Sequence, residues 1–151
     1  MKLLIFIPFL LLGILAIRRI RWAYVAFVVF GLLYFPASVR FRVDPKRCDL
    51  TFDLTAAVQS LSNFGHIISF FVFFLITAAQ FRQRGWQSLV WSMALTMAMG
   101  VAVELAEGLS GAHNCKTLDL IPDFAGALLG LIILLLGRKL AKVWQTRHSG
   151  A

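Results

Sequence analysis

Apolar residues fall along this chain in five long runs, which charged and turn-forming segments separate. A helix needs about 20 residues to cross a hydrocarbon core about 30 Å thick, and the runs come near that length, although the first two are short. The pattern predicts an all-α, polytopic transmembrane helix bundle with about five spans, at residues 2–17, 22–39, 64–81, 86–109 and 120–137.

The connections between these runs predict how the spans are oriented. Residues 18–21 and 82–85 form tight links, so each link joins antiparallel neighbours. Nine of the fifteen Lys and Arg residues lie beside span ends, as the positive-inside rule describes: Arg18, Arg19, Arg21, Arg82, Arg84, Arg138, Lys139, Lys142 and Arg147. We therefore expect the N-terminus outside and the C-terminus in the cytoplasm.

The composition agrees with a membrane protein. The chain is 60% hydrophobic and 15% charged, with a mean hydropathy of +0.81, which lies outside the range of soluble globular proteins. A net charge of +8 on a soluble chain would suggest nucleic-acid binding, but the positive-inside pattern explains it, so no nucleic-acid partner is expected. We expect one membrane domain, divided into two N-terminal spans (1–39), an outer segment (40–63), a three-span core (64–137) and a basic cytoplasmic tail (138–151).

Two segments are predicted to lie outside the membrane, and each carries one cysteine. Apolar residues recur at helical spacing from Leu50 to Leu61, which indicates either a short amphipathic helix on the membrane surface or a compact loop covering the bundle. Cys48 lies in this segment and Cys115 in the shorter outer segment, 108–118. A disulfide between them is expected on the oxidising side of a bacterial membrane, with two free thiols as the alternative.

Two glutamates stand inside a predicted span. Glu104 and Glu107 lie three residues apart and share one helix face. A charge at the bilayer centre costs roughly 2.5–3.5 kcal/mol, so such acids face a protein interior or a wet cavity. Asp119 and Asp123 share a face of the fifth span, and His66 begins the third. We predict that these polar residues meet at one depth, near the outer interface.

Each of these residues also has a structural explanation. Asp119 can cap the fifth helix, His66 can bond a nearby carbonyl, and Glu107 can be solvated. The candidate catalytic residues are Glu104, Asp119 and His66. The candidate substrate-binding residues are Glu107, Asp123, His113, Asn114 and Lys116.

Carboxylates and imidazoles together allow three kinds of chemistry. They can form a divalent-metal site, although the spacing matches no established metal motif and the metal, like any cofactor, is unknown. They can form a general acid and base pair. They can also bind a lipid headgroup, or hold the helices together without chemistry. Gly126 and Gly130 form a small-xxx-small face for packing against the fourth span or for homo-oligomerisation.

The ordered polar residues resemble those of the VanZ-like family of small bacterial integral membrane proteins. The resemblance covers roughly residues 63–137 and rests on His66, Glu104 and the run Asp119-x3-Asp123-x2-Gly126-x3-Gly130. The family pattern has Gln at the position of Glu107, Asn at that of Asp123, and an Arg in the outer loop where this chain has Lys116. This cluster is therefore more negative than that of the family.

The resemblance implies a multi-pass protein of the bacterial inner (cytoplasmic) membrane with a role in the cell envelope. The family takes its name from a protein associated with resistance to the glycopeptide teicoplanin. We expect the chain to bind or modify an envelope component, a lipid or lipid-linked glycan, in an outer-leaflet cleft. The alternative is a non-catalytic accessory subunit of a membrane complex. Membrane lipids are the expected partners, and a protein partner or a second copy could pack on the fifth span. A proton-coupled transporter ranks last, because the inner halves of these spans carry no acids.

Overall fold

The computed structural model describes residues 2–37, 48–81, 85–110 and 115–148, and these residues are helical apart from short connections. One isolated parallel β-bridge joins Asp49 to Lys116. The prediction of an all-α chain is therefore confirmed for the described residues. The helices are α1 Lys2–Ile17, α2 Arg21–Ala37, α3 Leu54–Ser60, α4 Phe64–Gln80, α5 Trp86–Leu109, the 3₁₀ turn η1 Thr117–Asp119, and α6 Leu120–His148.

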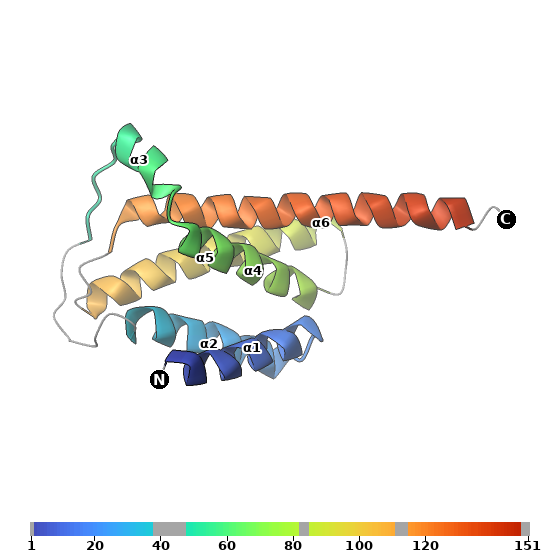
Figure 1. Cartoon of the computed structure of the whole chain (residues 1–151), viewed down its shortest axis with the longest axis horizontal. Helices are drawn as coiled ribbons and strands as arrows, with labels where there is room; N and C mark the ends of the chain where they lie inside the picture. The colour runs from blue at the N-terminus through green and yellow to red at the C-terminus, as the bar shows by residue number, and fades with distance from the viewer. Residues whose placement is uncertain (1, 38–47, 82–84, 111–114, 149–151) are drawn as a thin grey trace.

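The five long helices run side by side along the long axis of the molecule (Figure 1). The hairpin of α1 and α2 forms one side of the bundle, α6 forms the other, and α4 and α5 lie between them. The short helix α3 stands at one end, together with the first turns of α4 and α6 and the last turn of α5. We call this the α3 end. At the opposite end, which also holds the turn between α1 and α2, α6 projects beyond the other helices.

Within the described residues, two helical segments are long and apolar enough to cross a membrane, namely Trp86–Leu109 and Thr117–Arg147. A third span results if α3 and α4, which meet at a bend of 67°, are counted as one broken segment. Ile7–Ile17 and Arg21–Leu33 are shorter apolar helices. The chain is therefore a helical protein with two to three candidate spans, while five spans and the orientation of the termini stay predictions.

The fifth span was predicted to end at Gly137, and the helix α6 continues beyond it without a break to His148. Its last turns consist mainly of Leu, Ala, Lys, Arg and Gln, which have high helix propensity, and no proline interrupts them. A fall in hydropathy marks where a helix leaves an apolar environment. It does not mark where the helix ends.

The helix expected in the long outer segment is present, but it is shorter than the apolar pattern indicates. It begins at Leu54, where the Asp53 carboxylate accepts a hydrogen bond from the Ala56 amide at 3.1 Å, and Leu50 lies outside it. Such a bond satisfies one of the free N–H groups at a helix start. Leu54 and Val58 are exposed while Ala57 is buried, as expected of a helix resting on an apolar surface.

The interior of the bundle is built from large side chains of four helices. Phe27 of α2 stacks on Phe9 of α1 and on Phe73 of α4, with ring centroids 4.5 and 5.9 Å apart. Met99 and Val103 of α5 complete the cluster. Between helices in a bilayer such packing, rather than exclusion of water, drives association.

Helix α6 approaches α4 closely at two glycines. A Cβ atom built on Gly126 would lie only 2.2 Å from the carbonyl oxygen of Ile67, and one on Gly130 would lie 2.8 Å from a ring carbon of Phe74. The predicted small-xxx-small face therefore packs within the chain, but against α4, the third predicted span, rather than the fourth. This contact fixes the first turn of α6 beside the first turn of α4.

Candidate functional site

His66 and Asp123 are paired across the interface between α4 and α6. His66 Nδ1 lies 2.7 Å from Asp123 Oδ1, and the Asp123 side chain is fully buried whereas that of His66 is 16% exposed. When Asp123 is ionised its oxygens only accept hydrogen bonds, and Nδ1 is then the donor in this pair. The sequence placed both residues at the same depth, and the structure shows that they are in contact.

Glu104 and Glu107 are buried on the face of α5 that turns toward the same region. Their relative exposures are 6% and 7%, so solvation, the alternative explanation for Glu107, does not agree with the structure. Glu104 Oε2 accepts a hydrogen bond of 2.8 Å from the backbone amide of Lys116. Lys116 therefore contributes through its backbone, while its side chain is exposed. No side-chain pattern could have indicated this contact, because every residue type except proline offers the same amide.

The amide of Lys116 is held in place by the β-bridge. The Asp49 amide donates to the Cys115 carbonyl at 3.0 Å, and the Thr117 amide donates to the Asp49 carbonyl at 3.1 Å. The side-chain carboxylate of Asp49 accepts from the amide and hydroxyl of Thr51, at 3.0 and 2.6 Å. These bonds hold the pKa of Asp49 below its usual range. The two outer segments are therefore one hydrogen-bonded unit.

The predicted disulfide between Cys48 and Cys115 is confirmed, with a Cα–Cα distance of 4.8 Å. It packs directly on α5, since a Cβ on Gly108 would lie 3.0 Å from Cys48 Sγ and 3.4 Å from Cys115 Sγ. Gly108 is one helical turn beyond Glu104. The disulfide thus holds the residues of the β-bridge against the part of α5 that carries Glu104 and Glu107.

Among the described residues, two carboxylate oxygens in this region are buried without a hydrogen-bond partner, Glu104 Oε1 and Asp123 Oδ2. A buried polar atom that is left unsatisfied costs about 1–3 kcal/mol, and more when it is charged. Glu104 also interacts electrostatically with Glu107, Asp119 and Asp123, and we call these four acids the carboxylate cluster. Two of the four acids, Glu104 and Asp123, therefore each have one oxygen that is hydrogen-bonded and one that is not.

Gly100 makes room for one of these oxygens. A Cβ at this position would lie 2.9 Å from Asp123 Oδ2, so any larger residue would push the carboxylate away from α5. Gly100 precedes Glu104 by four residues and therefore shares its helix face. Sequence reasoning missed this residue. The signal available was a glycine one turn before an acid within an apolar span.

The remaining predicted residues differ in how far the structure tests them. Asp119 is the last residue of η1 and is half-buried, and its backbone amide donates to the Lys116 carbonyl at 3.0 Å. It therefore lies in the turn that leads into α6. His113 and Asn114 fall outside the described residues, so their roles stay predictions.

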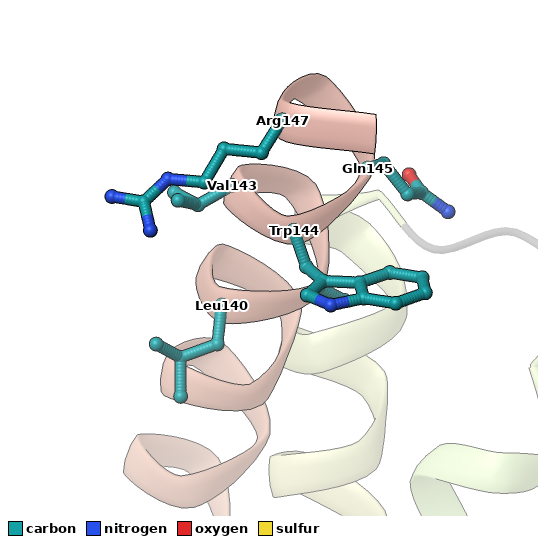
Figure 2. A pocket seen from close by; sticks show the side chains of 6 residues that line it. Leu140, Val143, Trp144, Gln145 and Arg147 are labelled. Carbon is teal, nitrogen blue, oxygen red and sulfur yellow. The ribbon is translucent and has the colours of Figure 1, made fainter. Parts of the chain in front are cut away.

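The described part of the chain contains no group of three or more His, Cys, Asp or Glu residues that could hold a metal ion. The geometry therefore gives the metal interpretation no support. A shallow pocket lies far from the cluster, on the projecting part of α6 (Figures 1 and 2), and its lining residues include Leu140, Val143, Trp144 and Arg147.

The arrangement allows two kinds of chemistry. A histidine oriented by a buried aspartate can transfer protons, as a general acid or base does. Carboxylate oxygens without partners can also accept hydrogen bonds from the hydroxyl or amino groups of a ligand. Comparisons with models of protein families, with curated proteins and with solved structures find no match for this chain.

Proposed function

We propose that this chain is a VanZ-like, multi-pass protein of the bacterial inner membrane that binds or modifies an envelope component at the α3 end of its bundle. The ligand is a lipid or a lipid-linked glycan of the outer leaflet. The carboxylate cluster and His66 receive the polar headgroup, and a contribution to glycopeptide (teicoplanin) resistance follows from that role.

One observation carries the proposal: Glu104 Oε1 and Asp123 Oδ2 are buried without hydrogen-bond partners in the part of the chain that the structure describes. Folded proteins pair the large majority of buried polar atoms, and exceptions tend to have a functional explanation. Here two acceptors come from different helices, and a disulfide and a β-bridge close over the same end of the bundle. A headgroup bearing hydroxyl or amino donors would satisfy both oxygens.

If the component is modified as well as bound, His66 is the group that transfers the proton. Its Nδ1 is bonded to Asp123, which fixes the plane of the ring and stabilises the charged imidazolium. Glu104 and Asp119 would then act on the bound headgroup as acid, base or electrostatic partner. Binding without modification needs the same geometry, so the first experiment measures binding.

The experiment uses the full chain in nanodiscs assembled from bacterial inner-membrane lipid extract. Native mass spectrometry and lipidomics identify the components that stay bound to wild type, Glu104→Gln and Asp123→Asn. Both variants keep side-chain shape and a hydrogen-bond acceptor but remove the negative charge. We expect at least a tenfold lower retention of one wild-type component in both variants. In Glu104→Gln the unfolding midpoint should be unchanged or raised, because a buried charge without full compensation is removed.

Asp53→Asn is the matched control. It makes the same change of carboxylate to amide near the α3 end, where asparagine also caps a helix well. Equal loss in this control, or wild type without a retained component, would overturn the proposal.

A non-catalytic accessory subunit is the second candidate, favoured by the close contact between α4 and α6 and by the His66–Asp123 bond that crosses it. In that case the same residues serve to hold helices together. Glu104→Gln and Asp123→Asn would then lower the yield of folded protein, and a stoichiometric partner would co-purify with the wild type.

A further inference from the structure

The last turns of α6 extend beyond the rest of the bundle (Figure 1), and the described side chains from Lys139 to Arg147 are exposed. A helix rises about 1.5 Å per residue, so about 20 residues of α6 from Leu120 cover a hydrocarbon core about 30 Å thick. Leu140 therefore lies at the far edge of the hydrocarbon when Leu120 lies at the near edge. Residues after Leu140 reach the headgroup layer.

An exposed stripe runs along one side of α6 and changes character where the helix leaves the bundle. The residues of this stripe follow one another at intervals of four and three residues in turn, which places them on one helix face. Leu140 is 70% exposed, and Figure 2 shows Val143 and Arg147 projecting from the same side as Leu140. The stripe consists of Leu129, Ile133, Leu136, Leu140, Val143 and Arg147.

This order of groups matches the order of groups in a phospholipid. The apolar side chains come first, at the depth of an acyl chain, and the guanidinium of Arg147 follows at the depth of a phosphate. Arginine binds phosphate through two parallel hydrogen bonds, and its long side chain can reach back toward the membrane. Trp144, 64% exposed beside this face, suits the interface between hydrocarbon and headgroups.

The other cations of this segment favour a lipid with an anionic headgroup. Lys139 precedes Val143 by four residues and so lies at the edge of the stripe, whereas Lys142 lies on the opposite side of α6. Each cation near a membrane surface favours an anionic lipid by about 1 kcal/mol. A second copy of the chain is a poorer occupant, because parallel packing through the stripe would bring two Arg147 side chains together.

We propose that the projecting part of α6 binds an anionic phospholipid, whose acyl chain ends beside Leu140, whose glycerol backbone lies beside Val143 and whose phosphate contacts Arg147. The shallow pocket on this segment, which these three residues help to line, is where the lipid sits (Figure 2). This site is at the opposite end of the bundle from the carboxylate cluster and does not depend on the function proposed for that cluster.

The test reconstitutes the full chain in phosphatidylcholine nanodiscs that contain a minor fraction of phosphatidylglycerol. Native mass spectrometry counts the phosphatidylglycerol molecules that stay bound to wild type, Arg147→Gln and Leu140→Gln. Retention should fall about fivefold or more in both variants, one losing the phosphate contact and the other the apolar contact. Arg18→Gln is the matched control, because it removes an exposed cation from the turn between α1 and α2, at the same end of the bundle.

Retention in Arg18→Gln should stay at the wild-type level. An equal fall in Arg18→Gln and Arg147→Gln would show only general attraction between charges and would overturn the proposed site. Unchanged retention in both α6 variants would overturn it as well. A dimer mass that disappears in Leu140→Gln would identify a second copy, rather than a lipid, as the occupant.

Discussion

Gly126→Ala tests whether the contact between α4 and α6 holds the candidate site together. The new Cβ would lie 2.2 Å from the Ile67 carbonyl oxygen, about 1.2 Å closer than the 3.4 Å at which ordinary van der Waals contact begins. The obstacle is backbone, so no side-chain rotation can relieve it. The two helices must move apart, and overpacking of this kind costs about 1–3 kcal/mol.

The same displacement should break the His66–Asp123 hydrogen bond. Asp123 precedes Gly126 by three residues, so a shift of α6 at the glycine also moves the carboxylate. His66 Nδ1 and Asp123 Oδ1 are 2.7 Å apart. If the helices separate by about 1.2 Å, the distance between these atoms exceeds the limit of about 3.2 Å for such a bond. We therefore expect loss of stability together with a change in the environment of the imidazole.

Unfolding in mixed detergent micelles, followed by circular dichroism as the denaturing detergent is titrated, measures the first effect. Imidazole ¹⁵N chemical shifts, assigned with a His66→Gln variant, measure the second. Gly137→Ala is the control, because a Cβ there meets no atom within 4 Å. Alanine in an open helical position should stabilise the chain by about 0.5–1 kcal/mol. Equal stability of the two alanine variants, or an unchanged His66 spectrum in Gly126→Ala, would refute the reasoning.

Two further predictions concern the outer segments. Replacing both Cys48 and Cys115 with serine should destabilise the chain by about 2–4 kcal/mol, because the disulfide closes a loop with a sequence separation of 67. Unfolding in mixed detergent micelles measures this loss. An unaltered midpoint would show that the β-bridge holds the two segments together without the disulfide. Asp49→Asn should reduce the loss of stability that occurs as the pH is lowered into the acid range. The native pKa of Asp49 is below its unfolded value, so its stabilising contribution is complete above about pH 4 and is lost as the pH falls further. Thermal midpoints of wild type and variant between pH 6 and pH 2.5 should therefore converge at the acid end, and a constant difference would contradict this.

Helix positions were the most predictable part of this structure. The bounds of α5 agree with the apolar run at 86–109, because charged residues flank that run on one side and glycines on the other. The extension of α6 to His148 was missed, since hydropathy reports the surroundings of a helix rather than its continuity. The direction of the small-xxx-small face was also missed, because a glycine pair shows that a helix approaches closely but not which one.

The sequence predicted which residues belong to the candidate site but not which atoms they contact. Spacing placed His66, Glu104 and Asp123 at one depth, and the structure brings them into one region. The donor to Glu104 is a backbone amide that side-chain identity does not reveal. Whether an acid inside a span has a partner depends on the atoms of neighbouring helices. The unpartnered oxygens could therefore not be found from the sequence.

The disulfide also restricts how the chain can thread a membrane. Cys48 and Cys115 are bonded, so the two points of the chain lie on one side of any bilayer that the bundle crosses. The stretch between them, which contains α4 and α5, must then cross that bilayer an even number of times. One covalent bond thus acts as a parity constraint. The bond can form only after the chain segment that carries α4 and α5 has been inserted and has returned to the starting side.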